Sequence, residues 1–164
     1  MNQQQAKILK RLLLKTFKIL LIVLLLAGGC EEIFRRRIGG WAGSYPFAET
    51  WEMYAREDKV IQAIKAVKEE NAYLKPPEDS SYRNEYWYFI DFYYRDTKQV
   101  IKTWVRADAD SATTTLAFVF LSDPANKEED KFINRDYWYF ANRREINKFE
   151  KQILEKIENK LYGR

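Results

Sequence analysis

The chain has 164 residues, which is enough for one folded domain and a further segment. It carries 28 basic and 24 acidic side chains, so its net charge at pH 7 is +4. Five of the basic residues precede residue 30 and no acidic residue does, which leaves 23 basic against 24 acidic residues in the remainder. A domain that binds nucleic acid needs a basic face of its own. The charge distribution therefore excludes that class, and we expect no nucleic acid among the partners.

The residues that the chain lacks limit its chemistry. There is no histidine, and Cys30 is the only cysteine. These absences exclude Ser-His-Asp and Cys-His catalysis, histidine-ligated metal sites and an intramolecular disulfide. Residues 44–162 contain no glycine, which excludes the glycine-rich loops that bind phosphates and dinucleotides. We therefore predict that the protein is not an enzyme and that it has no cofactor and no metal.

The N-terminal residues have the composition of an export signal. Residues 1–18 contain five basic residues, and residues 19–27 form an unbroken apolar run of nine. Together with the small residues that follow, this order predicts a signal peptide over residues 1–29. A membrane-spanning helix of about 20 residues would have to include Lys15 and Lys18, whose long side chains can reach the interface. An uncleaved transmembrane anchor is therefore the alternative.

The segment Leu26-Ala27-Gly28-Gly29-Cys30 resembles the lipobox of bacterial lipoproteins. This resemblance implies that the thiol of Cys30 receives a diacylglycerol group, that the signal peptide is cut just before this cysteine, and that the new amino terminus is acylated. It covers about 30 residues and implies nothing about the rest of the chain. An incidental free cysteine is the alternative interpretation.

Residues 30–46 are predicted to form a flexible tether after the lipidated cysteine, because three glycines, Ser44 and Pro46 lie within them. If Cys30 is lipidated, the arginines of this segment lie at the lipid headgroups, where each can contribute about 1 kcal/mol at an anionic surface. A solvated segment is the alternative. The expected location is the cell envelope, on the periplasmic side or at the outer surface, with the membrane as one partner. The arginines concerned are Arg35, Arg36 and Arg37.

The remaining residues, 47–164, are predicted to form a single α+β domain. Apolar residues recur every three or four positions over residues 55–71 and again over residues 142–161, which predicts a helix at each end of the domain. In the second of these helices, Asn142 and Glu145 have the spacing of a capping pair. We expect the two helices to lie on one face of a sheet.

The sheet is predicted from three segments, residues 85–94, 99–107 and 112–121. They are rich in aromatic and β-branched residues and are joined by short polar connections, which predicts an antiparallel meander. Residues 122–134 are charged and contain Pro124, so we expect a loop there, whereas the aromatic residues 136–141 predict a short fourth strand. The expected fold is therefore α+β, with three to four antiparallel strands.

Strand alternation predicts a candidate binding face on the sheet. Aromatic and basic residues of residues 85–94 and 99–107 point to the side with fewer aliphatic residues. An exposed aromatic face with a few charges suits a protein partner or a sugar polymer, and an aromatic-rich core is the alternative. Asp91 on the same side is expected to face Lys102 or Arg106. The residues of this candidate face are Trp87, Tyr93, Lys102, Trp104 and Arg106.

These observations favour a membrane-anchored, non-enzymatic lipoprotein of the envelope that binds a protein partner, as an accessory subunit or an immunity-type protein does. The second hypothesis is an envelope domain that binds glycans or cleaves them with carboxylates. The third is a purely structural membrane-anchored protein.

Overall fold

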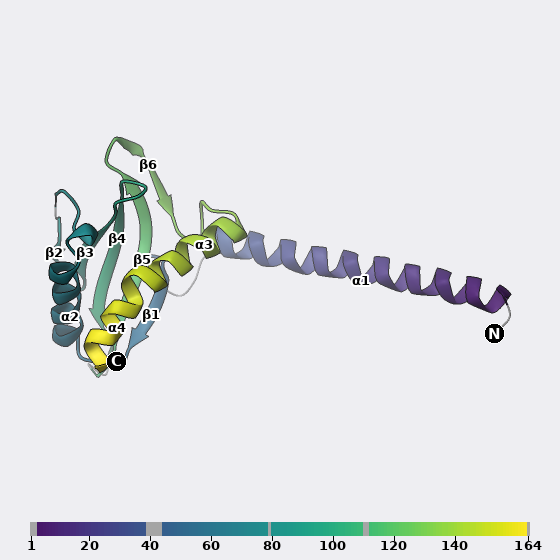
Figure 1. Cartoon of the computed structure of the whole chain (residues 1–164), viewed down its shortest axis with the longest axis horizontal. Coiled ribbons are helices and arrows are strands. Elements are labelled where there is room, and N and C mark those ends of the chain that lie inside the picture. The colour runs from purple at the N-terminus through teal and green to yellow at the C-terminus, as the bar shows by residue number, and fades with distance from the viewer. Residues whose placement is uncertain (1–2, 39–43, 79, 110–111, 164) are drawn as a thin grey trace.

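The protein consists of a small domain and one long helix that extends from it (Figure 1). We describe a computed structural model, which covers residues 3–38, 44–78, 80–109 and 112–163. The domain combines helices with an antiparallel sheet, so the expected α+β class is confirmed. The sheet has six strands, however, and not three or four.

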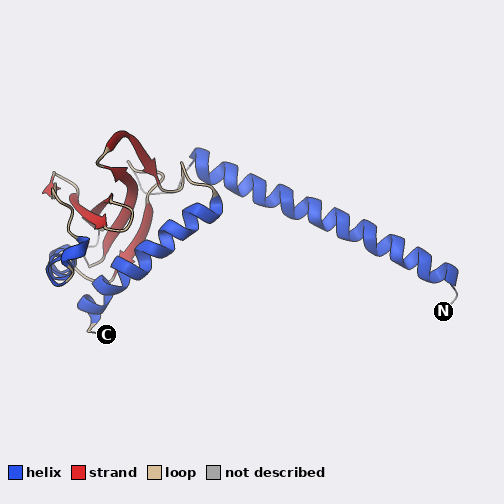
Figure 2. Ribbon diagram, turned by 45° about the horizontal axis from the view of Figure 1, so that its top comes forward, coloured by secondary structure: helices blue, strands red, loops and turns tan. Residues whose placement is uncertain are grey.

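The long helix, α1 (Gln3–Ile38), has 36 residues and is about 54 Å long at 1.5 Å per residue. Its apolar side chains between Leu13 and Leu26 are exposed, and α1 leaves the domain without another helix beside it (Figure 2). By length and composition it is able to cross a membrane, although a signal sequence near an N-terminus has the same properties.

The end of α1 differs from the expected tether. Residues 30–38 continue the helix, so the prediction of a flexible segment over 30–46 is wrong for this part. Glu32 forms an ion pair with Arg35 one turn later, at 2.7 Å, and three arginines occupy the last turn of the helix. Both features stabilise a helix, because basic side chains interact favourably with the carbonyl end of the helix dipole. Residues 39–43 of the expected tether lie outside the described residues.

The six strands form one sheet in the order β1-β5-β4-β3-β2, and β6 pairs with β5. β1 and β6 follow one another along the same edge of β5, because β1 pairs with its first half and β6 with its second. All pairs are antiparallel. The strands are β1 (Glu49–Met53), β2 (Tyr82–Arg83), β3 (Tyr88–Tyr94), β4 (Gln99–Ala107), β5 (Thr114–Asp123) and β6 (Asn126–Phe132).

The three expected strands correspond to β3, β4 and β5, and the bounds of β4 match the prediction. The expected loop over 122–134 is wrong in part, since β6 lies within it as the second strand of a hairpin with β5. The expected strand over 136–141 is also wrong, because residues from Tyr139 onward begin a helix. Strand propensity of aromatic residues depends on a free partner edge, and here β1 and β6 already occupy that edge of β5.

Both predicted helices pack on one face of the sheet, as expected. Apolar residues of the two helices share a single core cluster with residues of the sheet. The helical segments are α2 (Glu57–Glu70) with the short η1 (Ala72–Leu74), and α3 (Tyr139–Phe149), η2 (Glu150–Leu154) and α4 (Glu155–Tyr162), of which the last three form one continuous rod.

Phe149 lies at the centre of this core. Its ring stacks on Trp51 and on Phe118, each at 5.0 Å between centroids, and meets Phe92 edge to face. The apolar residues of the stripe that follows Phe149 recur every four residues. In an ordinary α-helix, each step of four residues turns the side chain by about 40° around the helix axis. The single π-helical turn η2 lies within this stripe and offsets the rotation. Ile153 and Ile157 consequently stay fully buried.

Candidate functional site

Cys30, the predicted lipidation residue, lies on α1 eight residues before the helix ends at Ile38. Its side chain is exposed and forms no disulfide. Gly28 and Gly29 have nothing within 4 Å of the position that a Cβ atom would occupy, so the surface of the helix is open next to the cysteine. The thiol is therefore accessible from outside the helix.

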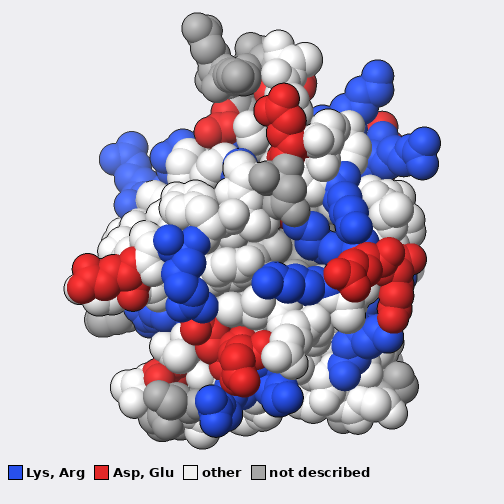
Figure 3. Space-filling model, turned by 90° about the vertical axis from the view of Figure 1, so that its left-hand side faces the viewer, with Lys and Arg blue, Asp and Glu red and all other residues white. Residues whose placement is uncertain are grey.

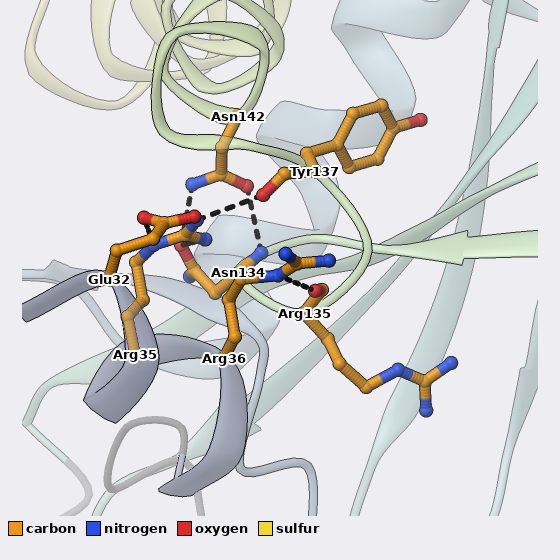
Figure 4. Close-up of polar contacts among 7 residues, drawn as sticks. All are labelled: Glu32, Arg35, Arg36, Asn134, Arg135, Tyr137 and Asn142. Carbon is orange, nitrogen blue, oxygen red and sulfur yellow. Dashed lines mark hydrogen bonds and ion pairs between the residues drawn. The ribbon is translucent and has the colours of Figure 1, made fainter. Parts of the chain in front are cut away.

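Arg35 connects α1 to the domain (Figure 4). Two of its guanidinium nitrogens donate to the two carboxylate oxygens of Glu32, at 2.7 and 3.2 Å. The same group donates to the carbonyl oxygen of Tyr137 at 2.9 Å and to Oδ1 of Asn134 at 3.5 Å. A planar guanidinium with five fixed donors suits such a set of acceptors. The side chains of Arg35 and Glu32 are largely buried, with 18% and 14% of their surface exposed.

Arg36 makes a second connection to the same loop. Its Nε atom donates to the carbonyl oxygen of Arg135 at 2.7 Å, and its guanidinium lies 4.7 Å above the centroid of the Trp138 ring. Arg135 in turn binds both carboxylate oxygens of Asp136 at 2.9 Å and packs over the ring of Phe132 at 4.1 Å.

Asn134 holds three elements together at this point. Its Nδ2 atom donates to Glu49 on β1 at 2.8 Å, and its side chain and backbone form a reciprocal pair of hydrogen bonds with the side chain of Asn142 on α3. Asn134 has a φ of 62°, a left-handed conformation that asparagine tolerates better than most residues. We call this assembly the α1–α3 joint, and it consists of Glu32, Arg35, Arg36, Asn134, Arg135, Tyr137 and Asn142 (Figure 4).

The joint involves residues for which the sequence predicted other roles. Arg35 and Arg36, expected at the lipid headgroups, contact the domain, whereas Arg37 is exposed. Asn142, expected as a helix cap, lies inside α3 because the helix begins three residues earlier. The signal that sequence analysis missed is the polar set Asn134, Arg135 and Asn142, which lies about 100 residues from α1 in the chain.

The candidate binding face predicted from alternation is only partly available. Asp91 faces Lys102 as expected, and Arg106 lies 6.0 Å from the Trp104 ring. Trp104 itself is only 1% exposed, however, because the ring of Tyr45 covers it at 6.1 Å. The expected exposure of Trp104 is therefore wrong. Tyr93 is half-buried, so part of its side chain is available on this face.

The exposed rings on this side come from residues that the sequence analysis did not select. Tyr82 on β2 is 57% exposed and stacks on Phe89, while Tyr86 is 60% exposed and contacts the half-buried Trp87 edge to face. We call these four residues, Tyr82, Tyr86, Trp87 and Phe89, the distal aromatic face, because β2 lies on the side of the domain away from α1 (Figure 1).

Charges of both signs are interspersed over the end of the domain opposite α1 (Figure 3). Neither the basic nor the acidic side chains form a continuous field in this view. A surface of this kind gives no long-range electrostatic attraction to a polyanion. The charges around the distal aromatic face are therefore compatible with a protein or glycan surface, which is recognised at short range.

One buried polar cluster lies on the same side of the sheet. Asp91 is 3% exposed, accepts a hydrogen bond from Ser80 and forms an ion pair with Lys102 at 2.5 Å. Lys102 also donates to the Ser80 hydroxyl at 3.0 Å. The arrangement ties the segment around Ser80 to the sheet.

Two buried or partly buried tyrosines have raised pKa values. Burial, with smaller contributions from Glu145 and Asp136, raises the pKa of Tyr137 to about 12. Burial likewise raises the pKa of Tyr94 far above its usual range. Both phenols consequently stay protonated at neutral pH. Over the described residues there is no group of three or more Asp, Glu, Cys or His side chains arranged to hold a metal ion.

Comparison of the chain with protein-family models, with curated proteins and with solved structures gave no match.

We predict that Arg35→Gln loosens the α1–α3 joint. The substitution removes charge-assisted hydrogen bonds, and loss of such bonds costs about 1.5–3 kcal/mol where they are shielded. Spin labels at Leu20→Cys and Tyr54→Cys, in a Cys30→Ser chain, report the distance between helix and domain by pulsed electron resonance. We expect a narrow distance distribution for the parent chain and a clearly broader one for Arg35→Gln. Arg37→Gln, which removes an exposed arginine two residues later, is the control and should keep the narrow distribution.

Acid should destabilise the domain partly through Asp136. Burial raises the pKa of this carboxyl, but hydrogen bonds from Arg135 and from the backbone N–H of Phe132 outweigh burial and hold the pKa below its usual value of 3.8. A lowered pKa in the folded state gives stability that is present above the unfolded pKa and is lost as the pH falls through the folded pKa. Asp136→Asn should therefore flatten the loss of stability from roughly pH 5 to pH 3, measured by urea unfolding in detergent. An unchanged slope would show that Asp136 contributes nothing to it.

Proposed function

We propose that the protein is a membrane-anchored lipoprotein of the cell envelope, and that its domain is a non-enzymatic module that binds a protein partner. An accessory subunit or an immunity-type protein is a module of this kind. The observation that carries the proposal is the α1–α3 joint. The end of α1, which carries Cys30, is attached to the folded domain by three hydrogen bonds from Arg35 and Arg36 to residues 134–137, so the domain keeps a fixed orientation relative to its anchor.

The distribution of basic residues supports an orientation with the domain outside the cytoplasm. Five basic residues precede the apolar run of α1, and three follow it at the end of the helix. Basic residues near a span are enriched on the cytoplasmic side. The more basic N-terminal flank then lies inside, and the domain lies on the envelope side of the membrane.

Lipidation of Cys30 is the proposed means of anchoring. The lipobox-like residues 26–30 support it, and the exposed position of the thiol on α1 is compatible with modification. Uncleaved α1 as a transmembrane anchor is the second candidate, and the observation that favours it is the continuity of the helix through Cys30 to Ile38. Both anchors place the joint a few residues from the membrane.

The distal aromatic face is the proposed contact for the partner. Exposed tyrosines next to a half-buried tryptophan provide large, rigid contact area with polar tips, which is common at protein interfaces. Aromatic rings also stack on sugars, so a glycan-binding domain is the alternative function. A carboxylate-based glycan-cleaving site finds less support, because Asp91 is engaged by Lys102 and Ser80.

Intact mass spectrometry tests the anchor. The chain is expressed in a bacterium, the membrane fraction is isolated, and the parent is compared with Cys30→Ser. We expect the parent to begin at Cys30 and to carry the mass of diacylglycerol and a further acyl chain, and we expect Cys30→Ser to lack both the cleavage and the lipid mass. A parent chain that is uncleaved and unmodified but still in the membrane would contradict lipidation and support the transmembrane anchor.

Replacement of the exposed rings distinguishes a protein partner from a glycan. Tyr82→Ala and Tyr86→Ala are combined in one variant, which should keep the fold because both side chains are more than half exposed. If the domain binds glycan through this face, the parent is retained on cell-wall polysaccharide and the variant is not. We expect that neither the parent nor the variant is retained on the polysaccharide. In intact cells, we expect the parent to form cross-links with a protein partner and the variant to lose them. Tyr54→Ala, which removes an exposed tyrosine elsewhere, is the matched control.

A further inference from the structure

Three consecutive aromatic residues at the start of α3 project into solvent. Trp138, Tyr139 and Phe140 are 70%, 53% and 86% exposed. Exposed aromatic patches of this kind mark surfaces that contact another phase or molecule. The N-terminal end of α3 lies beside the C-terminal end of α1 in both ribbon views, so these rings are at the end of the domain nearest the apolar helix (Figures 1 and 2).

Basic side chains surround these rings. Arg36 lies over the ring of Trp138 at 4.7 Å, and Arg37 is exposed next to it in the chain. Arg143 and Arg144 are also exposed, and they follow Phe140 by three and four residues, a spacing that places them on the same side of α3. The combination of aromatic rings with arginines is typical of the interface between a membrane and water.

The described acidic side chains at this end are paired with arginines. Glu32 is bound by Arg35 at 2.7 Å, and Asp136 accepts from Nε and Nη2 of Arg135 at 2.9 Å. The largely buried Glu145 lies 3.6 Å from Arg144, whose side chain is still 77% exposed. An open hollow of about 420 Å³ lies between α1 and the loop that precedes α3, and its lining includes Arg36, Arg37 and Trp138. The hollow gives an anionic headgroup access to the arginines.

The distance along α1 places this surface at the height of the headgroups. Arg36 follows Cys30 by six residues, which corresponds to about 9 Å of helix. The headgroup layer on each side of a bilayer is roughly 5–8 Å thick beyond the hydrocarbon. Whether lipid is attached at Cys30 or α1 itself spans the membrane, the hydrocarbon ends near Cys30, so the backbone of Arg36 lies at the outer boundary of the headgroup layer. Long arginine side chains and the ring of Trp138 can reach the headgroups from there.

We propose that the start of α3 rests on the membrane. In this arrangement the rings of Trp138, Tyr139 and Phe140 lie among the headgroups, and arginines at positions 36, 37, 143 and 144 bind anionic lipid. The inference rests on the proposed membrane anchor and adds to it a second contact, made by the folded domain. The distal aromatic face is then directed away from the membrane.

Depth-dependent fluorescence quenching tests this contact. A full-length Cys30→Ser chain carries a single new cysteine, labelled with an environment-sensitive fluorophore, and is reconstituted into vesicles of phosphatidylcholine and phosphatidylglycerol that contain lipids with a quencher at a shallow or a deep position. The label is placed at Phe140→Cys in the proposed contact and at Leu24→Cys in the apolar part of α1. Tyr54→Cys is the matched control, because Tyr54 is also an exposed aromatic residue (75%) and lies next to Tyr162 near the far end of the rod.

We expect the Leu24 label to be quenched by deep lipids, the Phe140 label to be quenched by shallow lipids, and the Tyr54 label to be unaffected. If the Leu24 label is quenched and the Phe140 label behaves like the Tyr54 label, the contact of α3 with the membrane is wrong and the transmembrane anchor stands. If the Leu24 label is not quenched, α1 does not act as a transmembrane anchor and the contact of α3 in this chain fails with it.

Charge substitution tests the headgroup component separately. In the chain with the Phe140 label, Arg143→Gln and Arg144→Gln together should reduce shallow quenching in vesicles that contain phosphatidylglycerol. The same pair should have little effect in vesicles of phosphatidylcholine alone. An equal effect in both vesicles, or none in either, would overturn the role of anionic lipid.

Discussion

The guanidinium group of Arg35 determines how the two parts of this protein are oriented. It is largely buried and donates to Glu32 on its own helix and to Asn134 and Tyr137 on the domain. Because the donors of a guanidinium lie in one plane at fixed angles, the group accepts only a narrow range of helix directions. In the proposed membrane-anchored state, the position of the domain depends on this interaction, including the height of α3 and the direction of the distal aromatic face.

The sheet divides the domain into two unequal sides, and this division separates the main hydrophobic core from the side that carries the proposed partner contact. On one side, α2 and the rod formed by α3, η2 and α4 bury the aliphatic residues and the stacked rings around Phe149. On the other side, a smaller cluster around Trp104 is covered by Tyr45 and bordered by half-buried rings. No helix covers this second side over the described residues, so its rings remain near the surface, where a partner can reach them.

Sequence patterns were sufficient where local periodicity decides the structure. Alternation in residues 99–107 identified β4 and gave Lys102 or Arg106 as the partner of Asp91, of which the structure has Lys102. The spacing of the apolar residues identified the C-terminal helix. Patterns failed where long-range contacts decide. The charged segment that forms β6 is a strand only because the β5 hairpin supplies a partner. The aromatic residues 136–141 have strand propensity but begin α3, and Arg35 contacts residues about 100 positions away, a pairing that no local period encodes.

The two edges of the sheet have a consequence for a protein held in a plane. One edge ends in β2, which has only two residues, and the other includes β6, in which five of seven residues are charged. Short or charged edges prevent backbone pairing between sheets. Molecules anchored to one surface meet far more often than molecules free in solution, and in a common orientation that would align exposed strands. In the proposed anchored state, the edges of this sheet let neighbouring copies crowd together on the membrane without joining into a continuous sheet.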